Sequence, residues 1–341
     1  MSSSPSAPAG SGPAALDRVV PLLRCPVCGQ GMEAVDRAVV CAAGHSFDRA
    51  RQGHLSLFGP RGRRFPGDGA DQVAARDRVL GSGLFDPLVA ILAGVAREVF
   101  APGTGGVHAG PARPVVLEPG AGTGFYLAGV VDALAAAGRP TGELGTDEGG
   151  PDESGPGGPG PAVLGVGTEI STAAARRLAR VHDDVAALVA DTWDGLPLAD
   201  DCVDLVQVVF APRNPAEFAR VLRPGGTLVV AVPGPGHLEP LRSAGGMLEP
   251  APDKSDRLDA DLADHFRPGE VRTVDVLTEV PAPVAVDLAL MGPSGVHLDR
   301  SGLEARLGPQ DRPVRIHVEV HTYRALPAGR PPPRPGEPLQ Q

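Results

Sequence analysis

The chain has 341 residues, a net charge of −10 and 42% hydrophobic residues, which is typical of a globular protein with a sizeable core. The acidic balance argues against a protein that binds nucleic acid with its whole surface, and no apolar run is long enough to cross a membrane. Four cysteines, three of them close together, argue against a disulfide scaffold and indicate a metal site in a reducing cytoplasm.

Residues 1–15 are rich in Ser, Pro, Ala and Gly, and we expect them to be disordered. The next segment contains Cys25-x2-Cys28, then twelve residues, then Cys41-x3-His45. Three thiolates and one imidazole make a closed tetrahedral set, which predicts one structural zinc ion. The alternative is a group of buried cysteines with an unrelated histidine.

A cluster of arginines follows in a chain that is otherwise acidic: Arg49, Arg51, Arg61, Arg63 and Arg64. Such a cluster is typical of a surface that contacts RNA phosphates, and a solvated loop is the alternative. Residues 71–100 then have the apolar spacing of two helices.

The stretch 114–131 has the pattern of a buried strand, a glycine turn and a helix. Glu118 ends the strand, and a G-x-G-x-G turn follows, formed by Gly120, Gly122 and Gly124. It is not the dinucleotide motif, because Phe125 occupies the position of that motif's last glycine. The turn resembles the first motif of class I S-adenosylmethionine methyltransferases. A chance turn in a glycine-rich chain is the alternative.

Two further strands are expected to end in acids that bind adenosine. The strand 163–169 ends at Glu169, where a carboxylate can accept both ribose hydroxyls, and a solvent-facing glutamate is the alternative. The strand 185–191 ends at Asp191, which in this fold typically meets the adenine amino group. Residues 138–161 lack an apolar pattern and predict a flexible insertion.

A fourth strand, 203–210, leads into a proline-rich loop where donor and acceptor meet in this fold. Arg213 is a candidate for a phosphate contact and Asn214 for a base edge, although entry into the next helix explains both residues. His237 follows the fifth strand at the same edge of the sheet, and a solvated loop histidine is its alternative.

The remaining pattern completes an α/β sheet. Residues 271–290 suggest a sixth strand or a hairpin arm, and the alternation in 314–320 predicts an antiparallel edge strand. Residues 327–341 are rich in proline, and we expect them to be disordered.

Taken in order, these motifs resemble the RlmA family of 23S rRNA (guanine-N1)-methyltransferases, including its TlrB-like macrolide-resistance type from actinomycetes. The resemblance runs from Leu23 to Leu326. It rests on CPVC…CAAGHSFDRARQGH, AARDRVLGSGLFDPL, LEPGAGTGFYL, GTEIS, VADTWDGLPL, VFAPRNPAEFARVLRPGGTL and VPGPGHLEPLR. It implies a cytoplasmic enzyme that uses S-adenosylmethionine to methylate N1 of a guanine in the domain II hairpin of 23S rRNA. It also implies a zinc domain that helps to hold the RNA, and it is compatible with a homodimer.

Residue by residue, the resemblance assigns the zinc ligands to Cys25, Cys28, Cys41 and His45. It assigns cofactor contacts to Phe85, Gly122, Thr123 and His237, and it identifies no catalytic base. Two positions depart from the family, because His54 and Phe85 stand where tyrosine is usual. The departures motivate an alternative function, a small-molecule methyltransferase of antibiotic biosynthesis.

The sequence as a whole predicts a class I methyltransferase fold, Rossmann-like with a seven-stranded sheet, and an N-terminal Cys3His zinc ribbon. The expected divisions are a zinc-binding RNA-recognition domain at 16–68 and a methyltransferase domain at 69–326.

Overall fold

The structure is a computed structural model, and it describes residues 14–60, 62, 63, 65, 67–101, 113–137, 163–247, 257–292, 295 and 298–327. Residues 1–13 of the expected disordered N-terminus, the expected insertion at 138–161 and the tail at 328–341 lie outside the described residues. Within the described ranges, no helix combines the length and the apolar character needed to cross a bilayer.

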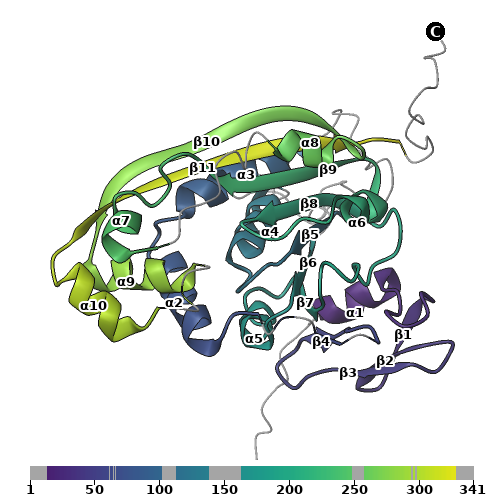
Figure 1. Ribbon diagram of the computed structural model, residues 1–341. Coiled ribbons are helices and arrows are strands. Elements are labelled where there is room, and N and C mark those ends of the chain that lie inside the picture. Colours follow the sequence, from purple (N-terminus) through teal and green to yellow (C-terminus); the bar gives the residue numbers. More distant parts are fainter. Residues whose placement is uncertain are drawn as a thin grey trace, which may run out of the picture.

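One mixed sheet organises the fold, in the strand order β10-β11-β9-β8-β5-β6-β7-β4 (Figure 1). Strands β4 to β9 are parallel to one another, whereas β11 is antiparallel to both β9 and β10. The bounds are β4 (Leu55–Ser56), β5 (Val115–Pro119), β6 (Leu164–Glu169), β7 (Val185–Val189), β8 (Val203–Val209), β9 (Leu222–Pro233), β10 (Phe266–Val280) and β11 (Arg312–Ala325). Every residue of β5, β6, β7 and β8 is buried, as expected for parallel strands that are covered on both faces.

Alternate residues of the central strands face two hydrophobic cores. Val116 and Leu205 belong to the core that α2, α3, α4 and α9 complete. Leu117 and Val206 belong to the core that α1, α6 and α8 complete. The bounds are α1 (Ala15–Val19), η1 (Val20–Leu22), α2 (Ala70–Leu80), α3 (Asp86–Val99), α4 (Phe125–Ala137), α5 (Thr172–Leu178), α6 (Pro215–Val221), α7 (Leu241–Gly245), α8 (Leu258–Leu262), α9 (Ala282–Met291) and α10 (Arg300–Leu307).

The N-terminal segment forms a small antiparallel sheet and then joins the main one. The small sheet contains β1 (Met32–Val35), β2 (Ala38–Cys41) and β3 (Ser46–Asp48). Strand β4 pairs in parallel with β7, so the seven predicted strands are present and β4 adds an eighth at the edge. The Ala199 N–H also donates to the Leu22 carbonyl at 2.8 Å, which ties the segment to the loop after β7.

The segment 271–290 differs from the expectation, because it divides between β10 and the helix α9. Residues 285–290 are all buried, and Asp287 is the only charged residue of this helix. It pairs with Arg78 of α2 and with Arg300. A helix buried over most of its surface carries little amphipathic period, and periodicity then cannot distinguish it from a strand.

Candidate active site and zinc centre

Three cysteines and one histidine of the N-terminal segment converge on one point. The ligand atoms of Cys25, Cys28, Cys41 and His45 all lie within 4.8 Å of one another. His45 Nδ1 lies 3.6 Å from Cys25 Sγ and 3.4 Å from Cys41 Sγ, and Cys28 Sγ lies 3.6 Å from Cys41 Sγ. Ligands on a tetrahedral zinc with Zn–S bonds of about 2.3 Å are about 3.7 Å apart. The four side chains therefore form a zinc-binding cluster, and its closed ligand set is that of a structural site.

The glycine turn lies between β5 and α4 and is packed tightly from two sides. Gly120 and Gly124 have φ angles of +67° and +85°, which side chains rarely adopt. A Cβ on Gly120 would lie 2.7 Å from Ala211 Cβ, and one on Gly124 would lie 2.6 Å from Leu178 Cδ1. Both positions therefore need glycine, and the turn is held between the loop after β8 and the helix α5.

Glu118 is fully buried in β5, just before this turn. The Gln207 side chain on β8 donates a hydrogen bond to its carboxylate at 2.7 Å. Burial raises the pKa of Glu118 to about 8. The side chain thus links β5 to β8 just before the turn, and its contact with a cofactor stays a prediction.

The acid at the end of β6 connects that strand to the glycine turn. Glu169 Oε2 accepts a hydrogen bond from the Gly122 N–H at 2.9 Å, and Oε1 accepts one from the Ser171 N–H at 2.7 Å. Burial raises the pKa of this carboxyl, and the two N–H groups partly oppose that effect. Gly122, Thr123 and Glu169 consequently lie together, at the position predicted for the ribose and the methionine part of the cofactor.

Asp191 follows β7 on the same edge and is 5% exposed. Its Oδ1 accepts a hydrogen bond from the Trp193 N–H at 3.0 Å, whereas its buried Oδ2 has no partner among the described residues. A buried carboxylate oxygen without a partner is costly, and an N–H donor from a ligand would satisfy it. The donor pattern of adenosine fits these two acids, because ribose offers hydroxyl groups and adenine offers an amino group.

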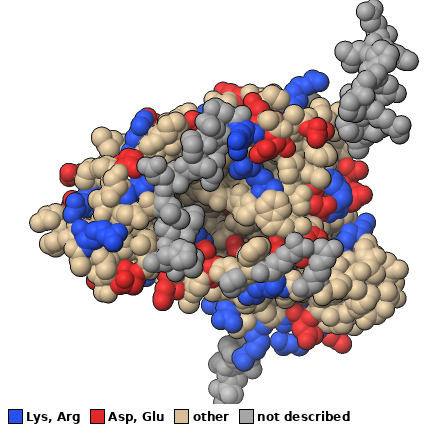
Figure 2. Space-filling model, viewed as in Figure 1, with Lys and Arg blue, Asp and Glu red and all other residues tan. Residues whose placement is uncertain are grey.

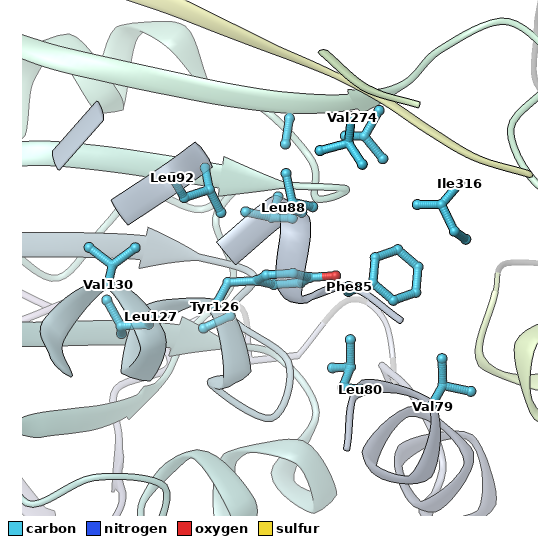
Figure 3. Packing of buried hydrophobic residues seen from close by; sticks show 14 of the residues in the cluster. Val79, Leu80, Phe85, Leu88, Leu92, Tyr126, Leu127, Val130, Val274 and Ile316 are labelled. Atoms are coloured by element: carbon cyan, nitrogen blue, oxygen red, sulfur yellow. The ribbon is translucent and has the colours of Figure 1, made fainter. Parts of the chain in front are cut away.

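An aromatic cluster completes this edge of the sheet. Phe85 is buried and contacts Tyr126 and Phe210, with ring centroids 6.5 and 6.3 Å away. The hydroxyl end of Tyr126 points toward the Phe85 ring, and Leu80, Leu88 and Ile316 surround them (Figure 3). The structure therefore brings Phe85 close to the glycine turn through Tyr126, which is on the first turn of α4.

His237 joins the same cluster, with its ring centroid 5.9 Å from that of Phe210. Burial and the charge of Arg242 lower the pKa of His237 to about 4, so the ring is neutral at pH 7. Its Nδ1 accepts a hydrogen bond from the His317 N–H at 3.2 Å, which assigns the proton to Nε2. A neutral ring that presents an N–H donor does not repel a cationic ligand.

Helix α2 lies beside the glycine turn, although its sequence gave no sign of a role there. The Arg76 guanidinium is 3.5 Å from the position of a Cβ on Gly122 and pairs with Asp68. Ser171 Oγ donates to the Asp68 carbonyl at 2.6 Å, so the chain that connects the zinc segment to α2 passes next to the predicted ribose acid.

The described arginines of the cluster, Arg49, Arg51 and Arg63, differ in their surroundings. Arg49 is turned toward the protein interior, because its Nη1 contacts Asp17 at 2.5 Å and its side chain is 20% exposed. Arg51 is exposed. Arg61 and Arg64 lie outside the described residues.

Arg63 is exposed and lies close to the predicted cofactor site. Its guanidinium lies 5.2 Å from the centroid of the Phe58 ring, and its Nη2 donates to Thr172 Oγ1 at 2.6 Å, at the start of α5. Basic side chains gather over the region of α5 and β4, whereas acidic and basic groups alternate on the rest of the face shown in Figure 2.

The two candidates after β8 have contacts within the chain. Asn214 caps α6, because its Oδ1 accepts from the Glu217 N–H at 3.5 Å while its Nδ2 donates to the Thr192 carbonyl at 2.9 Å. Arg213 is half-buried, and its charge acts on the hydroxyl of Tyr323. The helix-entry alternative therefore describes Asn214 well.

Comparison with known proteins agrees with this arrangement. Residues 23–60, which include all four zinc ligands and β4, match the zinc-ribbon family described as "RlmA, N-terminal". A "Putative 23S rRNA (guanine-N(1)-)-methyltransferase" of Micromonospora griseorubida is 37% identical over 91% of this chain and 98% of its own length. The 23S rRNA (guanine(748)-N(1))-methyltransferase of Streptomyces fradiae is 36% identical over 91% of this chain and 99% of its own.

The chain belongs to the family of 23S rRNA (guanine-N1)-methyltransferases. A more distant relative, "Putative 23S rRNA (guanine-N(1)-)-methyltransferase YxjB" of Bacillus subtilis, is 29% identical over 65% of this chain and 67% of its own length. Membership of this family accounts for the zinc ribbon and the methyltransferase fold in one chain. Three features close to the site have no signal in the sequence, namely β4 in the main sheet, Arg76 beside the glycine turn and the φ of +52° at Phe210.

Proposed function

We propose that the protein transfers a methyl group from S-adenosylmethionine to N1 of a guanine in the domain II hairpin of 23S rRNA. The observation that carries the proposal is that the zinc-binding segment contacts the predicted cofactor site directly. Strand β4 extends the methyltransferase sheet, and the connection at Asp68 contacts Ser171 beside Glu169. An RNA-binding segment at this position would hold the acceptor guanine next to the methyl group of S-adenosylmethionine.

The residues have separable tasks in this reaction. S-adenosylmethionine supplies an electrophilic methyl group when bound. Glu169 and Asp191 would hold the ribose and the adenine, and Phe85 and His237 would hold the sulfur end of the cofactor. Transfer is an in-line displacement, so orienting the two partners supplies most of the catalysis. Guanine N1 must lose its proton, and no side chain is assigned as the base.

The zinc-binding segment, 16–68, is proposed as the RNA-recognition domain and 69–326 as the methyltransferase domain. Arg51 and Arg63 are exposed and are the described arginines of the cluster best placed to meet phosphates. Arg61 and Arg64 keep their proposed role from the sequence alone, and Arg49 has a contact with Asp17 instead. The enzyme is proposed to act in the cytoplasm and to form a homodimer, and a role in macrolide resistance would follow from the position of the methylated guanine.

Primer extension along 23S rRNA tests the proposal. RNA from cells that express the protein should show a new stop in the domain II hairpin, because N1-methylguanine blocks base pairing. Cells with a double variant of the two acids, Glu169→Gln with Asp191→Asn, are the matched control and should show no stop. Absence of the stop with the native protein, together with no transfer of label to ribosomal RNA in vitro, would contradict the proposal.

A small-molecule methyltransferase of antibiotic biosynthesis is the competing function. It predicts that the protein has no salt-sensitive affinity for RNA, whereas phosphate contacts make RNA affinity fall steeply with salt. A filter-binding titration with domain II RNA at two salt concentrations separates the two functions.

A further inference from the structure

Arg76 lies beside the glycine turn of the proposed cofactor site, and the proposed cofactor has one anionic group. S-adenosylmethionine carries a positive sulfonium, a positive amino group and an α-carboxylate. The site described above contains two acids that suit the adenosine, Glu169 and Asp191, and the protonated carboxyl of Glu118 beneath the glycine turn. It needs a cation for the carboxylate, because an unpaired buried charge is costly.

The neighbours of the glycine turn identify the place of that cation. Gly120 faces Ala211 and Gly124 faces Leu178, so apolar groups close the turn on both of these sides. Gly122 faces Arg76 instead, with Nη1 at 3.5 Å and Cδ at 3.7 Å from the position of a Cβ, which is ordinary contact distance. Of the side chains that lie nearest to these three glycines in the described part of the chain, the Arg76 guanidinium is the charged one.

Two contacts hold the Arg76 guanidinium in place and leave some of its N–H donors available for a ligand. Its Nη2 donates to the Met291 carbonyl at the end of α9, at 2.9 Å, and its Nη1 pairs with Asp68. The side chain is 25% exposed. Arginine has five N–H donors, so these two contacts leave others for a carboxylate. A guanidinium held by two contacts keeps a fixed orientation, which suits it to bind both oxygens of a carboxylate.

We propose that Arg76 binds the α-carboxylate of the S-adenosylmethionine methionine group and so positions the methyl donor. This inference rests on the proposed function, because it takes the cofactor from there. In this arrangement Asp68 orients the guanidinium, and α2 and α9 carry the binding residue to the glycine turn from outside the strand–turn–helix motif.

Calorimetry with two ligands tests the assignment on the purified full-length protein. S-adenosylhomocysteine and its decarboxylated analogue share the adenosine, the thioether and the amino group, and they differ only in the carboxylate. We expect the native protein to bind S-adenosylhomocysteine more tightly than the analogue. Arg76→Met should weaken S-adenosylhomocysteine by about 10- to 100-fold, the range for losing a charge-assisted hydrogen bond. Arg76→Met should change the affinity for the analogue by no more than about twofold, because the analogue lacks the carboxylate that pairs with Arg76.

Two further variants separate binding from structure. Asp68→Asn removes the partner of Arg76 but keeps the cation, so the preference for the carboxylate should persist. Arg76→Lys keeps the charge without the fork, and we expect a loss about tenfold smaller than that of Arg76→Met. Thermal unfolding and zinc content show whether each variant is folded.

Equal losses for both ligands in Arg76→Met would overturn the assignment, as would a loss of the preference in Asp68→Asn that matches Arg76→Met. The outcomes also separate this inference from the proposed function. Normal S-adenosylhomocysteine binding by Arg76→Met, in an enzyme that methylates rRNA, would overturn the inference alone. The expected ligand preference without any methylation of rRNA would support the inference and contradict the choice of acceptor.

Discussion

The zinc cluster and the cofactor site are built in opposite ways. The four zinc ligands come from 21 consecutive positions, 25–45, and they meet through two short turns. The proposed cofactor site would combine four distant residues around one edge of the sheet: Arg76 on α2, Glu169 at the end of β6, Asp191 after β7 and His237 after β9. A local site depends on its own ligands, whereas a dispersed site depends on the whole fold. Disturbing each region should therefore have different consequences.

Removing zinc should have the largest effect. Structural zinc contributes roughly 10–16 kcal/mol of apparent binding free energy in small zinc domains. We expect Cys41→Ser, or treatment with a chelator, to release the metal and unfold the N-terminal segment. Because β4 belongs to the main sheet, the melting temperature of the whole protein should also fall. Metal analysis and calorimetry measure both effects.

Cys202→Ala is the matched control for this prediction. Cys202 is buried but lies apart from the zinc ligands, and its thiol donates to the Ala199 carbonyl at 3.0 Å. The Cys202→Ala variant should retain one zinc ion per chain. A protein that keeps its zinc after Cys41→Ser would contradict the account of the cluster.

A pH dependence of stability should arise beneath the glycine turn. Burial raises the pKa of Glu118 from 4.5 to about 8, so the folded protein retains a proton that the unfolded chain loses. The folded protein therefore has its full unfolding free energy from this group below pH 4.5, where Glu118 is protonated in both states. The unfolding free energy falls as the pH rises from 4.5 to about 8. The change in unfolding free energy is on the order of a few kcal/mol. Glu118→Gln should reduce the slope in urea titrations between these pH values, and an unchanged slope would argue against a buried protonated carboxyl.

Glu169, the predicted ribose acid, should affect both ligand affinity and the stability of the glycine turn. Glu169→Gln keeps the shape of the side chain but has one acceptor oxygen in place of two, so either the Gly122 or the Ser171 N–H loses its partner. We expect about a 10-fold weaker affinity for S-adenosylhomocysteine, and little change in zinc content. Calorimetry provides the measurement, and unaltered affinity would remove Glu169 from the site.

Two glycines, one in each region, give the smallest and the most matched comparison. Gly44 and Gly124 have similar φ angles of +84° and +85°, but nothing lies within 4 Å of a Cβ on Gly44, whereas Leu178 would clash with one on Gly124. Gly44→Ala should cost on the order of 1 kcal/mol of unfolding free energy for the backbone alone. Gly124→Ala should cost about 1–3 kcal/mol more, because packing must also shift. Equal costs would mean that the turn is not packed against α5.

The same contrast explains what the sequence could reveal. The zinc ligands were predictable because the spacing of Cys25, Cys28, Cys41 and His45 is typical of a tetrahedral zinc site. The strands after the glycine turn were predictable from their valine-rich runs and the acids that end them. In both cases the signal is contiguous in the chain.

Features that depend on distant contacts had no such signal. Strand β4 has two residues, and its pairing with β7 depends on where the zinc segment lies. Arg76 is one of two arginines on α2, and the packing of α2 against α9 brings it beside Gly122. Phe210 is the last residue of a predicted strand, and its positive φ appears only when the loop to Pro212 is folded.

The most direct test of the account uses the purified protein, 23S rRNA and S-adenosylmethionine with a deuterated methyl group. Mass spectrometry of the nuclease-digested RNA should show deuterated 1-methylguanosine, located in fragments of the domain II hairpin. The double variant Glu169→Gln with Asp191→Asn should give none. Deuterium on another base, on another atom of guanine or on no nucleoside at all would contradict the assignment of this enzyme to guanine N1.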